Sequence, residues 1–261
     1  SAAIYGARAS FGVLLITTKQ GKGDRIQVSY NNSFSWKKPT VLPNKTSDPY
    51  IYLKLKNIAV LNTPWSSGHV ASDERLEWAR QRSDNPTQTE SIRLNPLDQS
   101  QWEYMGNRDW TDYFLNRSTP SSSHQMSVSG ATDKTTFYLS GGYNQEDGLL
   151  SHAVKKDNYN RYSMRSRVKY KVWDWLNLSN ITSYVVTDRQ KPSYLGDMSV
   201  FYNLAPTDVD KNPDGSWANN SAGIAMAQLN DGGDWRIRNN RFQNTIGAEL
   251  NFFNNSLRIN G

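Results

Sequence analysis

The sequence predicts an all-β protein whose strands form part of an antiparallel transmembrane barrel. Apolar and polar residues alternate with period two in several stretches, as expected for strands with one face in lipid. Short and long connections between these stretches alternate strictly along the chain. Aromatic residues make up 12% of the 261 residues, with 9 Trp and 14 Tyr, which suits aromatic rows at two membrane interfaces.

The first alternating stretch begins after Arg25. Ile26, Val28 and Tyr30 lie on one face of it, and Gln27 and Ser29 lie on the other. It covers about a dozen residues, the length that a tilted strand needs to cross a bilayer. The pattern returns around residues 126–129, 137–144, 161–172, 176–186 and 241–252, and a seventh strand begins near Leu257.

The lengths of the connections support a membrane barrel over a soluble sandwich. The long connections cover about residues 37–122, 146–158 and 189–234, and short turns separate the other neighbouring strands. Outer-membrane barrels have short periplasmic turns and long extracellular loops, whereas a sandwich has no reason to sort its loops in this way. The first connection is too long to be structureless, and helices are predicted at 47–62, 72–83 and 109–115.

Residues 1–24 are predicted to form a separate unit. The continuous apolar run at 12–18 is typical of a strand that is buried on both faces, and glycines at 21 and 23 end it. The period-two pattern starts directly afterwards, so a boundary is expected between 1–24 and 25–261. The chain is therefore interpreted as an internal piece of a longer protein.

Several classes of function are disfavoured. Mean hydropathy is −0.74, and no apolar run approaches the ~18 residues of a membrane helix. Cysteine is absent, and the 3 histidines are scattered, so no catalytic constellation is visible and an enzyme is not expected. The net charge of +6 comes without a recognisable nucleic-acid-binding module, so no nucleic-acid partner is predicted.

Two groups of motifs resemble the SusC/RagA family of TonB-dependent outer-membrane transporters. The first is Tyr5-Gly6-Ala7-Arg8 before the apolar run at 12–18. The second comprises stretches at 107–110, 127–130, 137–148, 160–165 and 175–176, followed by a loop at 212–217. The matches keep their order over most of the chain.

This resemblance implies a barrel of about 22 strands with a plugged lumen. Residues 1–24 would end the plug domain, and 25–261 would supply roughly the first six or seven barrel strands. It further implies TonB-driven import of oligosaccharides or peptides across the outer membrane of a Gram-negative, Bacteroidetes-like bacterium. A SusD-like surface lipoprotein would act as a lid, outer-membrane lipid would surround the wall, and the TonB-contacting segment would lie outside this chain.

Two alternative classes of function stay open at this point. One is a soluble carbohydrate-binding β-sandwich, which would also account for the aromatic residues. The other is a passive porin or adhesion barrel, although such a barrel has no use for the plug-like segment at residues 4–19.

A basic row is predicted on one face of a single strand. Its members lie an even number of residues apart and would face the lumen or the plug. They are Arg161, Arg165, Arg167, Lys169 and Lys171. Such a row could pair with plug carboxylates, conduct an anionic or polyhydroxylated cargo, or serve as a hydrated wall. Like charges at every second position repel one another, so acidic partners are expected, with Glu249 as one candidate.

Two further sets of residues are candidates for binding. The loop aromatics Trp65, Tyr194, Trp217 and Trp235 could stack on sugar rings or contact the lid protein; anchoring and loop packing are the alternatives. Asp210, Asn212 and Asp214 have the spacing of the first calcium ligands of a loop, followed by Gly215. Ser221 stands where the bidentate Glu is required, and the 208–215 segment is also an ordinary turn signal. No other cofactor is predicted.

Overall fold

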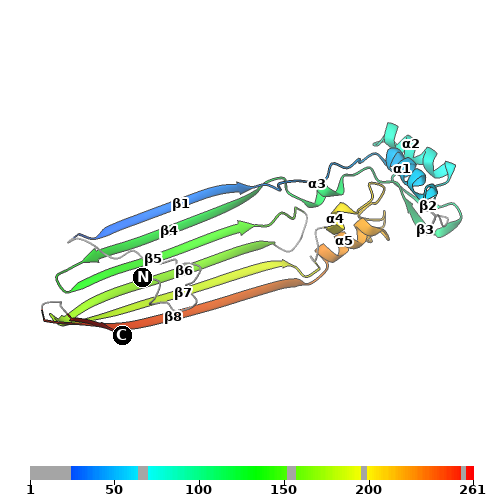
Figure 1. Cartoon of the computed structure of the whole chain (residues 1–261). Helices are drawn as coiled ribbons and strands as arrows, with labels where there is room; N and C mark the ends of the chain where they lie inside the picture. Colours follow the sequence, from blue (N-terminus) through cyan, green and yellow to red (C-terminus); the bar gives the residue numbers. More distant parts are fainter. Residues whose placement is uncertain (1–24, 64–69, 152–156, 195–198, 254–256) are drawn as a thin grey trace.

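The computed structural model describes residues 25–63, 70–151, 157–194, 199–253 and 257–261. The predicted plug segment at 1–24 and the candidate Trp65 lie outside these ranges. The molecule consists of a long sheet with a group of helices and short strands at one end, which we call the cap (Figure 1). In the described residues, none of the helices has the length and apolar character needed to cross a bilayer.

The sheet is antiparallel throughout, and its seven strands in the described residues lie in the order β1-β4-β5-β6-β7-β8-β9. Neighbours in the sheet are thus also neighbours along the chain, apart from the small hairpin β2–β3 inserted between β1 and β4. The strand bounds are β1 Gln27–Lys37, β4 Thr119–Ala131, β5 Thr135–Asp147, β6 Asn158–Trp173, β7 Leu176–Pro192, β8 Asp234–Phe252 and β9 Leu257–Asn260. The predicted all-β fold is confirmed, and the sheet is open at its β1 and β9 edges.

Short and long connections lie at opposite ends of the sheet (Figure 1). Residues 132–134 join β4 to β5, and residues 174–175 join β6 to β7. The long connections from β1 to β4 and from β7 to β8 form the cap at the other end. The sorting of connections by length therefore corresponds to two distinct ends of the sheet.

The first long connection contains α1 (Pro49–Leu61), α2 (Asp73–Asp84), β2 (Ile92–Asn95), β3 (Asp98–Tyr104) and α3 (Trp110–Phe114). The three predicted helices are confirmed. Ser72 caps the N-terminus of α2, and its hydroxyl accepts from the Arg75 amide at 3.2 Å. The β2–β3 hairpin was not predicted. The connection before β8 contains α4 (Ser199–Tyr202) and α5 (Ser221–Asn230), which were also not predicted.

The two long connections share one hydrophobic core. Trp110 and Phe114 from α3 pack with Phe201 and with the buried residues of α5. The indole Nε1 of Trp110 donates to the carbonyl of Ala205 at 2.9 Å. A second, smaller cluster joins α1 and α2 through Leu53 and Trp78. The cap therefore contains two packed clusters, and the larger one joins segments far apart in the sequence.

Gly106 lies where these two connections meet. Its amide donates to the carbonyl of Thr207 at 2.8 Å. A Cβ at this position would come within 2.2 Å of the Asp208 carbonyl oxygen and 2.8 Å of the Pro206 carbonyl oxygen. Only glycine allows the two backbones to approach this closely.

Candidate functional site

The sheet has two chemically different faces, because its register aligns like residues across the strands. Val28 pairs with Val128, and Val128 pairs with Leu139, which gives an apolar row. One residue further along, Ser29 pairs with Ser127, and Ser127 pairs with Ser140, which gives a polar row on the opposite face. In the described residues, the apolar face exposes Val28, Tyr30, Met126, Leu139, Met164, Leu178, Tyr184, Phe242 and Ile246.

A row of rings crosses the apolar face toward the cap end; we call it the tyrosine row. His124, Tyr143 and Tyr162 stack side by side, with centroid separations of 6.5 and 5.0 Å. The Tyr143 hydroxyl donates toward the cap end, to Gln145 at 3.0 Å and Asn160 at 3.2 Å. A tyrosine whose ring lies on apolar surface and whose hydroxyl reaches amides is typical of a membrane interface.

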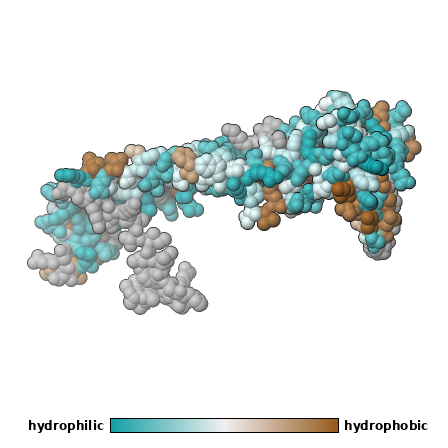
Figure 2. Space-filling model, turned by 90° about the horizontal axis from the view of Figure 1, so that it is seen from above, coloured by the Kyte–Doolittle hydropathy of each residue, from teal (hydrophilic) through white to brown (hydrophobic). Residues whose placement is uncertain are grey.

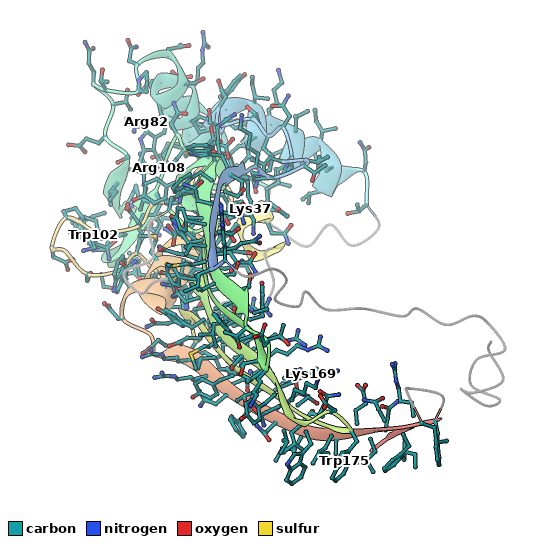
Figure 3. All side chains as sticks on the ribbon, turned by 90° about the vertical axis from the view of Figure 1, so that its left-hand side faces the viewer. Lys37, Arg82, Trp102, Arg108, Lys169 and Trp175 are labelled. Atoms are coloured by element: carbon teal, nitrogen blue, oxygen red, sulfur yellow. The ribbon has the colours of Figure 1, made fainter. Side chains whose placement is uncertain are left out.

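A second aromatic group lies at the opposite, short-turn end of the sheet. Trp173 and Trp175 stack at 5.1 Å, and Phe252 stacks on Trp175 at 6.1 Å. Figure 3 shows Trp175 at this end and Lys37 beside the cap. From Tyr162 to Trp173 the chain advances about 11 residues, or about 28 Å along the membrane normal at the usual rise and tilt. This is close to the ~25 Å apolar band of outer-membrane barrels.

A group of three mutually bonded polar side chains lies on the apolar face. Thr182 donates to Asn180 at 2.9 Å, Asn244 donates to Thr182 at 2.7 Å, and Asn180 donates to Asn244 at 3.3 Å. Each side chain is thus both donor and acceptor within a closed ring of bonds. In hydrocarbon an unpaired polar group costs several kcal/mol, so mutual bonding lowers the cost of placing this group in a lipid-facing wall.

The basic row predicted on one strand lies on the polar face of β6. Arg161 pairs across the ladder with Asn144 and Thr187, and Arg165 pairs with Ser140 and Ser183. The even spacing of these residues keeps all members of the row on this face: Arg161, Arg165, Arg167, Lys169 and Lys171. Their role as lumen-facing or plug-facing residues stays a prediction.

Part of the basic row has acidic partners. The Lys169 ammonium lies 2.9 Å from Glu249 on β8, the partner that the sequence suggested, and Arg258 lies 3.6 Å from the same carboxylate. Lys171 pairs with Asp174 at 2.6 Å. Among the described residues, no acidic side chain lies within ion-pair distance of Arg161 or Arg165. The polar face therefore carries net positive charge near its centre.

The candidate aromatic residues do not form one cluster. Tyr194 follows β7 and is 59% exposed. Trp235 is the second residue of β8, and the Lys191 ammonium lies 5.1 Å from its ring, so both aromatic residues lie at the cap end of this strand pair. Trp217 lies inside the cap, where Lys211 covers its ring at 4.6 Å. It also packs against the main hydrophobic cluster. Cargo binding by Tyr194, Trp217 and Trp235 stays a prediction.

The three predicted calcium ligands have separate hydrogen-bond partners. Asp210 accepts from Arg108 at 3.4 Å and from Tyr113 at 3.2 Å. Asn212 accepts from the Tyr104 hydroxyl at 3.0 Å. Asp214 accepts from the amide of Ser216 at 2.9 Å, which is the bond of an ordinary turn, with Gly215 at φ +85°. Calcium would have to displace Arg108 from Asp210, and its binding here stays a prediction.

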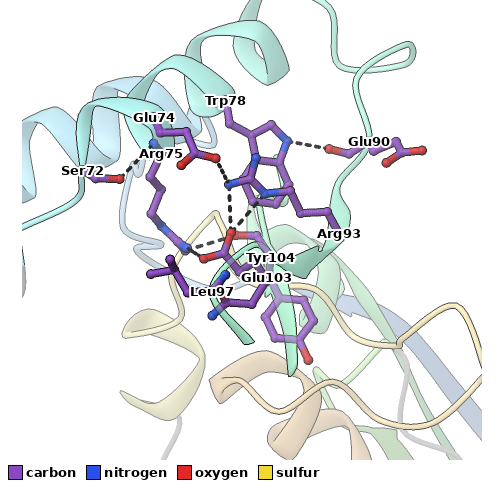
Figure 4. A network of polar contacts seen from close by, with 10 residues as sticks. Ser72, Glu74, Arg75, Trp78, Glu90, Arg93, Leu97, Glu103 and Tyr104 are labelled. Carbon is purple, nitrogen blue, oxygen red and sulfur yellow. Dashed lines mark hydrogen bonds and ion pairs between the residues drawn. The ribbon is translucent and has the colours of Figure 1, made fainter. Parts of the chain in front are cut away.

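Within the cap, one polar network fixes the β2–β3 hairpin to α2 (Figure 4). The Arg93 guanidinium donates to Glu103 at 3.1 and 3.0 Å and to Glu74 at 2.9 Å. The guanidinium also lies 4.2 Å from the ring of Trp78, whose Nε1 donates to the Glu90 carbonyl at 2.9 Å. Arg75 of α2 also donates to the Tyr104 carbonyl at 3.2 Å, so two arginines position a short hairpin that has no core of its own.

Replacing Arg93 with methionine is expected to release this hairpin. The change removes hydrogen bonds between charged groups and a cation–π contact, and the local free energy of unfolding should fall by about 2 kcal/mol. Hydrogen exchange of residues 92–104 measures the effect, and Arg80→Met on the exposed side of α2 is the matched control. Equal exchange in both variants would contradict the role assigned to Arg93.

A polar cavity of about 480 Å³ lies between α1 and the segment before α5. Asp208 lines it and accepts from the Ala222 amide at 3.3 Å. Burial raises the pKa of this carboxyl above its ordinary value. Because the raised pKa belongs to the folded state, the contribution of Asp208 to stability is present at low pH and is lost as the pH rises through that pKa.

No protein-family model matches the chain. It is 30% identical over 162 residues to the TonB-dependent receptor SusC of Bacteroides thetaiotaomicron, which covers 62% of this chain and 12% of that protein. It is 27% identical over 217 residues to the TonB-dependent receptor P26 of Formosa agariphila, which covers 83% of this chain and 18% of that protein. The chain therefore spans less than a fifth of the length of these curated relatives.

Solved structures show the same fold. The RagAB peptide transporter superposes with a TM-score of 0.60 at 18% identity, over 97% of this chain and 29% of the other. The RagAB peptide importer in its open-open state gives a TM-score of 0.61, also at 18% identity, with the same coverage of both chains. The two-faced sheet, the order of the elements and these sequence matches agree: the chain resembles TonB-dependent receptors of the SusC/RagA kind in both sequence and fold.

Proposed function

We propose that this chain forms part of the wall and extracellular cap of an outer-membrane transporter that imports nutrients with energy supplied through TonB. The observation that carries the proposal is the sheet with an apolar face between two aromatic rows and a polar, basic opposite face. Such a sheet suits lipid on one side and an aqueous lumen on the other. In this arrangement, the cap lies on the extracellular side and the short turns lie in the periplasm.

The basic row fits a lumen wall in this proposal. Arg161 and Arg165 would face either the plug or the passing cargo, and the serines beside them would be hydrated. Oligosaccharides and peptides both suit a wall of hydroxyl and guanidinium groups. The names of the relatives include both a Sus-type receptor and a peptide importer, so the cargo class is left to the experiment.

A partner protein on the cap is part of the proposal. Helix α1 exposes an apolar stripe of Ile51, Leu55, Ile58 and Leu61, and Figure 2 shows apolar residues on the cap in brown. Exposed apolar surface of this kind is typical of protein–protein contacts. A SusD-like surface lipoprotein is the partner that the family resemblance implies. Purification of the full-length protein from outer membranes should recover such a lipoprotein.

Uptake in the bacterium that carries the full-length gene tests the function. Deleting the gene should abolish accumulation of one labelled pool, either mixed oligosaccharides or mixed peptides. Removing TonB should abolish accumulation while leaving binding at the cell surface intact. Accumulation that continues without TonB would contradict active import and favour a passive porin. Binding of glycan by a detergent-free, soluble form of the protein would favour the β-sandwich alternative.

A further inference from the structure

A polar pocket of about 180 Å³ lies in the cap, between α2 and the segment that precedes α5. Its lining includes Arg82 from the last turn of α2, Arg108 from the residues just before α3, and Lys211. Figure 3 labels Arg82 and Arg108 in the cap. Segments that are far apart in the sequence thus each contribute a cationic residue to one pocket.

Arg82 lacks an acidic partner. Its Nη1 donates to the Thr89 carbonyl at 2.8 Å, but its Nε is buried and bonds to no other group in the part of the chain that the structure describes. The same part of the chain holds no carboxylate within ion-pair distance of this guanidinium. Burial lowers the pKa of Arg82 below its ordinary value, because it disfavours the charged form. A partly buried charge of this kind needs a counter-ion.

The two acidic residues of the lining already have other partners. Asp210 accepts from Arg108 at 3.4 Å and from Tyr113 at 3.2 Å. Asp208 accepts from the Ala222 amide at 3.3 Å. The described lining has three cationic and two acidic residues, so one positive charge remains uncompensated. The charge balance of the pocket therefore suits a ligand with a single negative charge.

The donor groups suit a carboxylate. A guanidinium group presents its N–H donors as a planar fork that matches the two oxygens of a carboxylate. The Arg108 guanidinium is held in place, 5.0 Å from the ring of Trp110 and 4.3 Å from the ring of Tyr113. Ser91 and Asn107 add polar groups to the lining. Ordered water could bond to the Arg82 Nε, but it would leave the charge of Arg82 uncompensated.

We propose that this pocket binds the carboxylate group of a small organic acid, with Arg82 and Arg108 as its donors. Lys211 is exposed, so the lining reaches the surface of the cap and the acid can enter from solvent. The bound acid joins α2, which packs in the smaller cluster of the cap, to Arg108, which stacks on the larger one. This site is independent of the transport function proposed above.

Hydrogen exchange of the full-length protein in detergent tests the site, with acetate as the probe. Sodium acetate is compared with sodium chloride and sodium phosphate at equal ionic strength and neutral pH. In acetate, exchange of residues 80–92 and 206–211 should slow at least threefold relative to chloride. Phosphate should protect these residues less than acetate, because its second negative charge exceeds what the lining can balance.

Variants of the lining show whether the acetate effect arises in this pocket. Arg82→Gln should abolish the effect, whereas Arg80→Gln, on the exposed side of the same helix, should keep it. Lys211→Gln changes an exposed residue and should leave exchange in chloride unchanged. It should raise the midpoint of the acetate titration at least threefold, so the proposal can be tested even where Arg82→Gln loosens the cap.

Three results would overturn the proposal. Equal exchange in all three salts would mean that the pocket holds ordered water only. Protection by phosphate that matches protection by acetate would exclude the carboxylate assignment. Protection that requires a co-purifying protein, and that acetate does not reproduce, would assign Arg82 to a protein contact instead.

Discussion

Replacing Ile246 with arginine is expected to destabilise the sheet in a membrane by about 2–4 kcal/mol. Ile246 is 75% exposed on the apolar face of β8. It lies about six residues along the strand from the level of the tyrosine row, or about 15 Å below that row at the usual rise and tilt. This depth is near the middle of the apolar band, where a guanidinium group loses the most hydration.

The neighbouring residue provides the control for this prediction. Thr245→Arg introduces the same side chain one position away, where the alternation of the strand directs it to the polar face. Its effect should stay below about 1 kcal/mol. Denaturant unfolding of the full-length protein in phospholipid vesicles, followed by tryptophan fluorescence, measures both variants. Equal destabilisation by the two arginines would contradict the assignment of the lipid-facing side.

Replacing Trp110 with alanine is expected to cost the cap about 3–5 kcal/mol. The indole is buried against Phe114, Tyr113 and the helices of the connection before β8. The variant leaves a cavity in this core and also removes the donor to the Ala205 carbonyl. Both effects act on the connection before β8, which is almost a hundred residues away from Trp110 in the sequence.

The effect of Trp110→Ala should therefore appear in a part of the chain that is not mutated. Hydrogen exchange of residues 199–230 in the full-length protein should rise strongly. Leu97→Ala, at a residue of the cap that is 97% exposed, should leave this exchange unchanged. Unchanged protection of α5 in the Trp110 variant would show that the two connections fold independently.

Sequence pattern alone was sufficient for the sheet, because each strand carries its own signal. Alternation places Val28 and Ser29 on opposite faces whatever their neighbours are. The Ser72 side chain, which bonds to the first turn of α2, marks the start of that helix locally. The Lys169–Glu249 pair could also be foreseen, because repulsion along the basic row requires acidic partners. The strand and helix predictions depend on interactions within one element, whereas the Lys169–Glu249 pair joins β6 to β8 over 80 residues of sequence and followed from the charge pattern alone.

The missed elements depend on distant packing or on weaker local signals. Helix α5 is apolar on several sides because it is buried against α3, so it has no clear amphipathic stripe, although Asn220 caps it by accepting from the Gly223 amide. The β2–β3 hairpin is held by Arg93, Trp78 and Arg75, through contacts that no local pattern reveals. The polar pocket beside α2 could be located only once the fold had brought its cationic residues together.

The strands continue beyond the tyrosine row toward the cap. On β7 the hydrogen-bonded ladder extends from Val186 to Pro192, and on β8 it extends from Asn240 to Asp234. These further residues, about six on each strand, correspond to about 15 Å along the membrane normal. The extracellular rim of the proposed pore would thus extend beyond the lipid headgroups. A lipid-anchored lid protein would need a tether long enough to span the distance from the membrane surface to this rim before it could close the entrance.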